Sequence, residues 1–126
     1  MRLLLDTHAL LWYVGLPEKL TKNSAGAIRN SENLVLISAV SIWEIVIKSA
    51  AGKLKADIDL ILSEMSSSGM RELPITIAHT MGVRDLPRHH GDPFDRILIA
   101  QALAEELTIV TADKVFSAYS VPVLTA

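Results

Sequence analysis

The stretch Leu3-Leu4-Leu5-Asp6-Thr7-His8 decides the fold, because an uninterrupted apolar run ends there at an acidic residue. Apolar runs without polar alternation are typical of strands that are buried on both faces of a sheet. Further short runs of this kind follow along the chain and predict strands at 34–37, 71–74, 108–111 and 122–124. We therefore expect a sheet that is covered on both sides.

Helical patterns lie between the expected strands. Apolar periodicity, capping residues and glycine or proline breaks predict helices at about 8–14, 21–30, 39–51, 57–67, 77–83 and 93–106, with a loop over 87–93. Strands separated by helices imply parallel crossover connections. The sequence thus predicts the α/β class, as a three-layer α/β/α sandwich around a central, mainly parallel sheet.

Length and composition narrow the class of protein further. The 126 residues suit a single domain, which we expect to span 1–126, and half of them are apolar. That apolar fraction indicates a partner or self-association surface besides a core. The absence of cysteine excludes disulfides and thiolate zinc sites. No apolar run approaches the roughly 18 residues of a membrane span, so we expect a cytoplasmic protein.

The net charge of −2, from 12 basic and 14 acidic residues, argues mildly against a nucleic-acid binder that relies on a basic surface. The argument weakens if several carboxylates hold metal ions. Two bound divalent cations would make the net charge positive.

Four acidic residues stand where a parallel α/β fold places its ligands, which is beyond the carboxyl ends of the strands. Asp6 and Asp113 follow strands, Asp95 lies at a helix start, and Glu44 lies one turn into the helix after the second strand. Each has an ordinary explanation as a helix cap, a dipole partner or, for Glu44, an i,i+4 partner of Lys48. Asp92, just before a proline, is best explained as a helix N-cap.

Taken together, the four acids are harder to explain structurally. Carboxylates that converge on one sheet edge repel one another unless a cation neutralises them. Glu44 also lies among apolar neighbours, where an unpaired carboxylate is costly. Ligands that are all oxygen suit Mg²⁺ or Mn²⁺, and such clusters orient and polarise phosphodiesters.

Four motifs carry a family resemblance that covers nearly the whole chain. They are Leu3-Leu4-Leu5-Asp6-Thr7-His8-Ala9-Leu10-Leu11-Trp12, Ser41-Ile42-Trp43-Glu44-Ile45 with Lys48, the stretch from His90 to Ala102 with its core Asp92-Pro93-Phe94-Asp95-Arg96, and Thr111-Ala112-Asp113. With these motifs in this order, the chain resembles PIN-domain proteins, and among them the VapC-like toxins of toxin–antitoxin pairs.

The resemblance implies a Mg²⁺- or Mn²⁺-dependent endoribonuclease that is blocked by a cognate antitoxin and forms a homodimer. It implies Asp6 and Asp95 as the first choices for direct metal ligands, with Asp113 completing the set. Glu44 would bind through water or orient the nucleophile. Water would attack phosphorus in line and leave 5′-phosphate and 3′-hydroxyl ends.

Three further residues have supporting functions in this interpretation. Thr7 and Thr111 would assist by hydrogen bonding. Arg96 would either contact phosphate or form a salt bridge that orders the acids, and the sequence does not decide between these two functions.

Other classes fit the residues less well. A haloacid-dehalogenase-like phosphatase needs a second acid two residues after Asp6, where His8 stands. A receiver domain needs an acidic doublet after the first strand, which Leu4-Leu5 does not provide. A DNA-cleaving relative and a metal-binding module without turnover remain as alternatives.

The histidines, basic residues and aromatic residues give weaker indications of function. His89 and His90 are adjacent, so they form a poor ligand pair for one ion and suit a loop or phosphate-side position. Trp12, Trp43 and Phe94 are better explained as core or interface residues than as base-stacking platforms. Six basic residues could flank an RNA path, although most would simply be solvated: Lys48, Lys53, Lys55, Arg84, Arg88 and Arg96.

Overall fold

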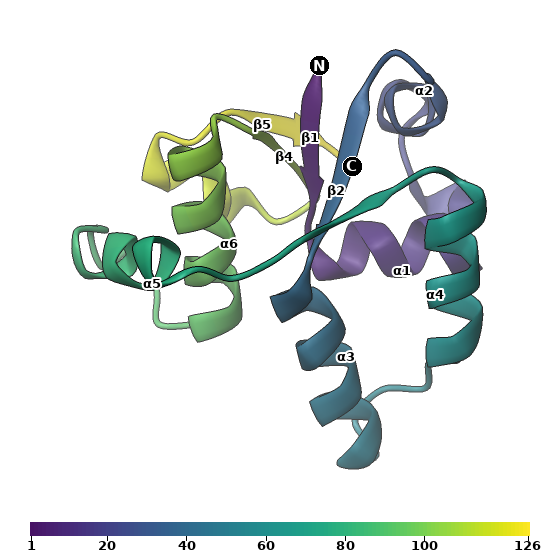
Figure 1. Cartoon of the computed structure of the whole chain (residues 1–126), viewed down its shortest axis with the longest axis horizontal. Helices are drawn as coiled ribbons and strands as arrows, with labels where there is room; N and C mark the ends of the chain where they lie inside the picture. Colours follow the sequence, from purple (N-terminus) through teal and green to yellow (C-terminus); the bar gives the residue numbers. More distant parts are fainter.

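The sheet lies at the centre of the molecule and is parallel throughout (Figure 1). The computed structural model describes residues 1–126. Five strands run in the order β3-β2-β1-β4-β5: β1 (Arg2–Leu5), β2 (Leu34–Ser38), β3 (Arg71–Leu73), β4 (Thr108–Thr111) and β5 (Val123–Thr125). All five expected strands are present, and the prediction of a mainly parallel sheet is confirmed.

Helices cover both faces of this sheet. They are α1 (Thr7–Gly15), α2 (Lys22–Arg29), α3 (Ala39–Ala50), α4 (Ile58–Ser67), α5 (Ile77–Arg84) and α6 (Pro93–Glu105), with 3-10 helices η1 (Pro17–Lys19) and η2 (Lys114–Tyr119). In Figure 1, α1, α2 and α4 lie on one side of the strands, and α5 and α6 lie on the other. The three-layer prediction is thereby confirmed.

Burial on two faces explains the apolar run of β1. Leu3 and Leu5 belong to the core cluster that includes residues of α1, α2, α3 and α4, whereas Leu4 belongs to the cluster that includes α6 and η2. Successive side chains of a strand point to opposite faces, so a strand between two helical layers needs apolar residues at every position. None of these three leucines is exposed to solvent.

Each helix bound differs from the expected one by at most one residue, and local backbone features explain several of the differences. Asp6 and Thr21 cap α1 and α2, so these helices begin at Thr7 and Lys22. Helix α6 ends at Glu105 because Glu106 adopts a left-handed conformation, with φ of 56°. The 3-10 helix η1 was not expected.

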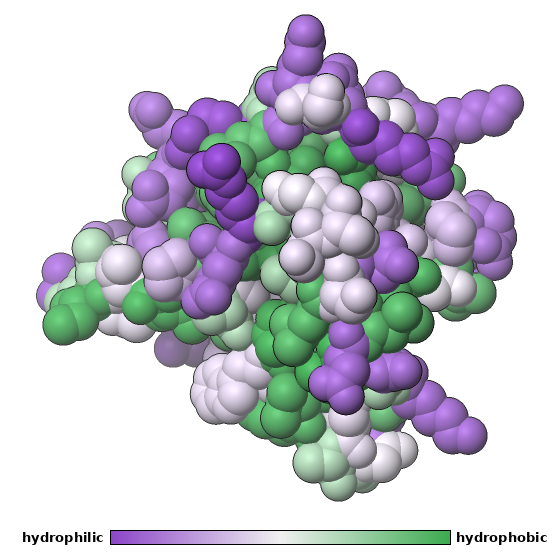
Figure 2. All heavy atoms as spheres, turned by 45° about the vertical axis from the view of Figure 1, so that its right-hand side comes forward, coloured by the Kyte–Doolittle hydropathy of each residue, from purple (hydrophilic) through white to green (hydrophobic).

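The surplus of apolar residues lies partly on the surface. Exposed side chains of this kind include Trp43, Val46 and Ile47 on α3, and Leu60 and Leu62 on α4. Figure 2 shows hydrophobic surface over the lower part of the molecule, where α3 and α4 lie. No helix is long and apolar enough to cross a membrane.

Candidate active site

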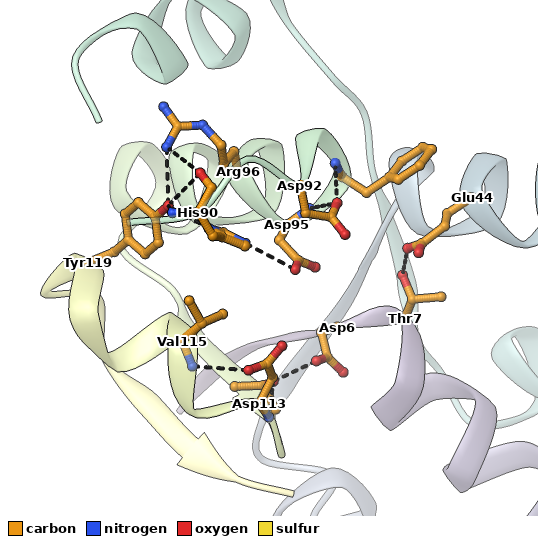
Figure 3. A network of polar contacts seen from close by, with 12 residues as sticks. Asp6, Thr7, Glu44, His90, Asp92, Asp95, Arg96, Asp113, Val115 and Tyr119 are labelled. Atoms are coloured by element: carbon orange, nitrogen blue, oxygen red, sulfur yellow. Dashed lines mark hydrogen bonds and ion pairs between the residues drawn. The ribbon is translucent and has the colours of Figure 1, made fainter. Parts of the chain in front are cut away.

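Four separate segments meet beyond the carboxyl ends of the central strands (Figure 3). Asp6 directly follows β1, and the helix that carries Glu44 follows β2. Asp113 follows β4 after one intervening residue, Ala112. The N-terminal turn of α6 brings in Asp92 and Asp95. Parallel strands end at a common edge, so their topology gathers residues that are far apart in sequence.

Asp6 has a structural contact and a contact across the sheet. Its Oδ1 caps α1 by accepting a hydrogen bond from the backbone N–H of Ala9 at 2.8 Å. Its Oδ2 accepts a hydrogen bond from the Thr111 hydroxyl at 2.6 Å. Burial raises the pKa of Asp6 above its ordinary value, and the charge of Asp113 adds to this, while the two hydrogen bonds oppose it. Asp6 therefore caps a helix and also belongs to the acid cluster, so the two explanations of this residue do not exclude each other.

Glu44 is 4% exposed and binds partners with both of its oxygens. Oε1 accepts a hydrogen bond from the Thr7 hydroxyl at 2.6 Å, and Oε2 pairs with the Lys48 ammonium at 2.5 Å. The hydrogen bond to Glu44 raises the pKa of Lys48. Ser38 caps this helix, as its position directly after the strand suggested. Lys48 thus compensates a buried carboxylate that apolar neighbours alone would not tolerate.

Asp92 is the N-cap of α6, as predicted. Its Oδ1 accepts hydrogen bonds from the backbone N–H groups of Phe94 at 2.9 Å and Asp95 at 3.2 Å. Asp95 instead turns its Oδ2 toward His90 Nε2 at 3.2 Å. Burial raises the pKa of Asp95 to about 6, the charges of Asp92 and Glu44 contribute, and His90 opposes them. The acids therefore act on one another electrostatically.

Asp113 joins the cluster through Thr111. Its Oδ1 caps η2 by accepting a hydrogen bond from the backbone N–H of Val115 at 3.0 Å. Its own backbone N–H donates to the Thr111 hydroxyl oxygen at 3.0 Å, and that hydroxyl donates to Asp6. Thr7 and Thr111 both bond to acids of the cluster, which is the contact expected of them.

The contacts of Arg96 correct the sequence interpretation. The side chain is 7% exposed and forms no salt bridge with any acid. Its Nη1 donates to the carbonyl of Pro87 at 2.9 Å and to the hydroxyl of Tyr119 at 3.1 Å, and further contacts reach the carbonyls of Val83, Leu86 and His90. Consecutive helix residues point about 100° apart, so the neighbour of Asp95 faces the loop before α6.

Two residues beside the cluster were missed. The sequence predicts a loop or phosphate-side position for His90, and it predicts no function for Tyr119. The His90 ring contacts Asp95 on one side and the Tyr119 hydroxyl on the other, at 2.6 Å. The position of His90 five residues before Asp95, across a predicted Asp-Pro helix start, was the available signal. Nothing in the sequence indicated Tyr119.

The aromatic residues differ in exposure. Trp43 is 58% exposed and packs edge to face on the half-buried Phe94, with ring centroids 5.6 Å apart. The two rings belong to the residues that directly precede Glu44 and Asp95 in sequence. Trp43 was expected to be a core or an interface residue. Its exposure excludes the core, so an interface position remains the prediction for it.

The donor set fits a hard divalent cation. Every candidate ligand is a carboxylate, and the pKa values of Asp6 and Asp95 are raised by burial and by neighbouring acids, a condition that a bound cation would relieve. In Figure 3 the carboxylates of Asp6, Asp95 and Asp113 point into one common space. No three acidic or histidine side chains stand close enough to form a finished ion cage. Hydrogen bonds to protein groups now hold oxygens of Asp6 and Glu44.

Comparisons with known proteins show the family of the chain. The model of the PIN domain family matches residues 3–122. The ribonuclease VapC22 of Mycobacterium tuberculosis (strain ATCC 25618 / H37Rv) is 26% identical over 114 residues, which cover 88% of this chain and 86% of that protein.

Solved structures show the same fold. A chain in the crystal structure of VapBC2 from Rickettsia felis, bound to a DNA fragment from their promoter, gives a TM-score of 0.77 at 17% identity, with 98% of both chains covered. DNA-bound VapBC from Salmonella typhimurium gives 0.71 at 13% identity, with 98% of this chain and 97% of that chain covered. FitAcB from Neisseria gonorrhoeae gives 0.63 at 22% identity, with 98% and 96% covered. Because the family model matches nearly the whole chain, the chain belongs to the PIN-domain family.

Proposed function

We propose that the chain is a Mg²⁺- or Mn²⁺-dependent endoribonuclease that acts as the toxin of a toxin–antitoxin pair. The observation that carries the proposal is the convergence of Asp6, Glu44, Asp95 and Asp113, from four separate segments, on one edge of the sheet. Membership of the PIN-domain family and similarity to a protein named a ribonuclease support it.

In this proposal Asp6 and Asp95 are the direct ligands of the cation, and Asp113 completes the set. Glu44 takes part through water or orients the nucleophile. A cation bound there would supply Lewis-acid polarisation of the phosphodiester and would lower the pKa of water.

The chain's own residues prepare this site. The hydroxyls of Thr111 and Thr7 hold one oxygen each of Asp6 and Glu44. Lys48 places a positive charge on the flank of the acid cluster, where it balances Glu44 and lies within the electrostatic reach of Asp92 and Asp95. Water as the nucleophile, attacking phosphorus in line, would leave 5′-phosphate and 3′-hydroxyl ends.

The proposed partners are single-stranded RNA, a cognate antitoxin and a second copy of the chain. The similar solved structures described above include complexes named VapBC, which supports an antitoxin partner. The exposed apolar side chains of α3 and α4 offer surface for such contacts. We propose that the chain acts in the cytoplasm, because toxin–antitoxin proteins of the PIN-domain family typically do so.

The test compares wild-type protein, Asp6→Asn and the matched control Asp85→Asn, which changes an exposed aspartate outside the cluster. Each is incubated with end-labelled single-stranded RNA, and with DNA of the same sequence, in Mg²⁺, Mn²⁺ or EDTA. Wild type and Asp85→Asn should cleave RNA internally only with the metal, and Asp6→Asn should not. Growth on expression of each form provides a second readout.

Three results would overturn the proposal. Cleavage of DNA in preference to RNA would favour the DNA-cleaving alternative. Products with 2′,3′-cyclic phosphate ends would mean that the 2′-hydroxyl of the RNA attacks. Equal behaviour of wild type and a folded Asp6→Asn under every condition would favour a module without turnover.

A further inference from the structure

The hydroxyl of Tyr119 lies at the centre of a buried polar network behind the acid cluster. Tyr119 ends η2 and is 4% exposed. Its oxygen lies 3.1 Å from Arg96 Nη1, 3.1 Å from the backbone nitrogen of His90 and 2.6 Å from His90 Nδ1 (Figure 3). Three groups from two other segments therefore meet at one phenolic oxygen.

The donors and acceptors at this oxygen determine where its proton goes. A phenol has one proton to donate and two lone pairs to accept with. The guanidinium of Arg96 and the backbone N–H of His90 can only donate, so they use both lone pairs. The phenolic proton must then go to an acceptor. Nδ1 of His90 at 2.6 Å is much nearer than the other candidate, the carbonyl of His90 at 3.4 Å.

The tautomer of His90 follows from this count. If Nδ1 accepts the phenolic proton, the ring proton must lie on Nε2. Nε2 faces Asp95 Oδ2 at 3.2 Å, so His90 donates to that oxygen. The other oxygen of Asp95 has no hydrogen bond to the protein and points toward the common space of the cluster (Figure 3).

We propose that Tyr119, supported by Arg96, is a positioning residue that holds His90 in its Nε2–H tautomer, so that His90 fixes the orientation of the Asp95 carboxylate. This proposal rests on the function proposed above, because that function makes Asp95 a direct ligand of the cation. Outer partners of this kind set the orientation of ligand carboxylates, and losing one weakens metal affinity by about 10- to 100-fold.

The surroundings explain why Asp95 needs such a device. Asp92 lies three residues before it and also carries a negative charge that acts on Asp95. Regular structure is absent between α5 and α6, so no hydrogen-bond ladder holds the backbone of His90. Arg96 holds this segment through the carbonyls of Leu86 and Pro87, and Tyr119 holds His90 itself. The carboxylate of Asp95 is thus oriented by His90, which contacts Tyr119. Tyr119 in turn contacts Arg96, the residue that follows Asp95 in sequence.

The main test is the substitution Tyr119→Phe, with Tyr13→Phe as the matched control. The chain has two tyrosines, and the hydroxyl of Tyr13 contacts only Ser68, on an exposed part of the molecule. Long-range ¹H–¹⁵N correlation spectra of the metal-free protein, at about pH 8 and above the ordinary imidazole titration range, report the tautomer of each histidine. A His90→Gln variant assigns the His90 signals by their loss.

Wild type and Tyr13→Phe should show His90 as the Nε2–H tautomer. In Tyr119→Phe the two ring nitrogens of His90 should approach averaged shifts, and Mn²⁺ affinity measured by calorimetry should fall about 10-fold. An Nδ1–H tautomer in wild type would overturn the proposal. Unchanged His90 shifts and unchanged Mn²⁺ affinity in a folded Tyr119→Phe would do so as well.

A second variant separates positioning from a general loss of packing. Glutamine at position 90 carries its amide nitrogen near the place of Nε2, so His90→Gln can donate to Asp95 without help from Tyr119. Adding Tyr119→Phe to His90→Gln should therefore change Mn²⁺ affinity by less than about 2-fold, because the two changes are coupled. An additive 10-fold loss in the double variant would overturn the positioning function.

The tautomer measurement does not depend on turnover. If wild type shows the expected tautomer but neither binds Mn²⁺ nor cleaves RNA, the function proposed above is overturned while the hydrogen-bond assignment is supported.

Discussion

Replacing Asp95 with Asn should make the metal-free protein more stable at neutral pH, although the carboxylate that accepts a part-buried hydrogen bond from His90 is replaced. Burial and the charge of Asp92 raise the pKa of Asp95 from 3.8 to about 6. The folded state therefore holds this proton more tightly than the unfolded state does. Between pH 3.8, the ordinary pKa, and about pH 6, the pKa in the folded protein, the free energy of unfolding falls as pH rises. Above about pH 6 the ionised Asp95 destabilises the folded state to its full extent.

The size of the effect follows from the shift. About two pKa units correspond to about 3 kcal/mol of destabilisation at pH 7. Asparagine removes this penalty and can still accept the hydrogen bond from His90 Nε2. It also loses the favourable interaction of a charge with the first turn of α6, which is worth about 0.3–1 kcal/mol. We expect a net gain of about 2 kcal/mol at pH 7.

The assay is urea unfolding of wild type, Asp95→Asn and Asp85→Asn in EDTA at several pH values. The difference between Asp95→Asn and wild type should be about 2 kcal/mol at pH 7 and should shrink toward zero near pH 4, because Asp95 in the folded wild type is itself protonated there. Asp85→Asn, which changes an exposed carboxylate, should show no such gain. An Asp95→Asn protein less stable than wild type by more than about 1 kcal/mol at pH 7, with an unchanged m value, would mean that the ionised Asp95 carboxylate does not destabilise the folded protein.

Three further predictions concern the cation and the packing around it. Mn²⁺ affinity should fall about 10-fold between pH 7 and pH 5 as Asp95, with its pKa of about 6, takes up a proton, and calorimetry showing a flat profile would contradict this. Glu44→Gln should abolish RNA cleavage while circular dichroism shows a retained fold, whereas full activity would reduce Glu44 to a partner of Lys48. Arg96→Ala should lower the free energy of unfolding by about 3 kcal/mol or more, because carbonyls of the loop before α6 lose their donor, and an unchanged urea midpoint would rule out its structural function.

Much of the fold could be predicted from the sequence because burial on both faces of a sheet explains the apolar pattern of its strands. Leu3-Leu4-Leu5 and Leu34-Val35-Leu36-Ile37 are apolar at every position, and only a strand between two helical layers buries all of them. The 3-10 helix Pro17–Lys19 lacked a comparable signal, because it spans only three residues and buries none. Its existence depends on local turn geometry.

The acidic members of the site were predictable for a topological reason. Residues that follow neighbouring parallel strands share one edge, so Asp6 and Asp113 could be brought together without coordinates. The contacts between them were not predictable in detail. Thr111 reaches Asp6 across 105 positions of sequence, and Tyr119 reaches His90 across 29. Such pairs have no spacing rule, because tertiary packing alone sets them.

Arg96 shows where sequence proximity misleads. It follows Asp95 directly, which suggested a contact with phosphate or with the acids. The rotation of about 100° per helical residue turns its side chain toward the loop and Tyr119 instead. Its importance for the site is therefore indirect, through the segment that carries His90.

The central claim is that Asp6 and Asp95 bind one divalent cation in common. Its most direct test is anomalous diffraction from crystals grown or soaked with Mn²⁺. We expect an anomalous peak within about 2–2.5 Å of a carboxylate oxygen of each of these two residues, and we expect this peak to disappear in Asp6→Asn. A well-occupied Mn²⁺ elsewhere on the molecule, with none between Asp6 and Asp95, would mean that these two residues do not share a cation.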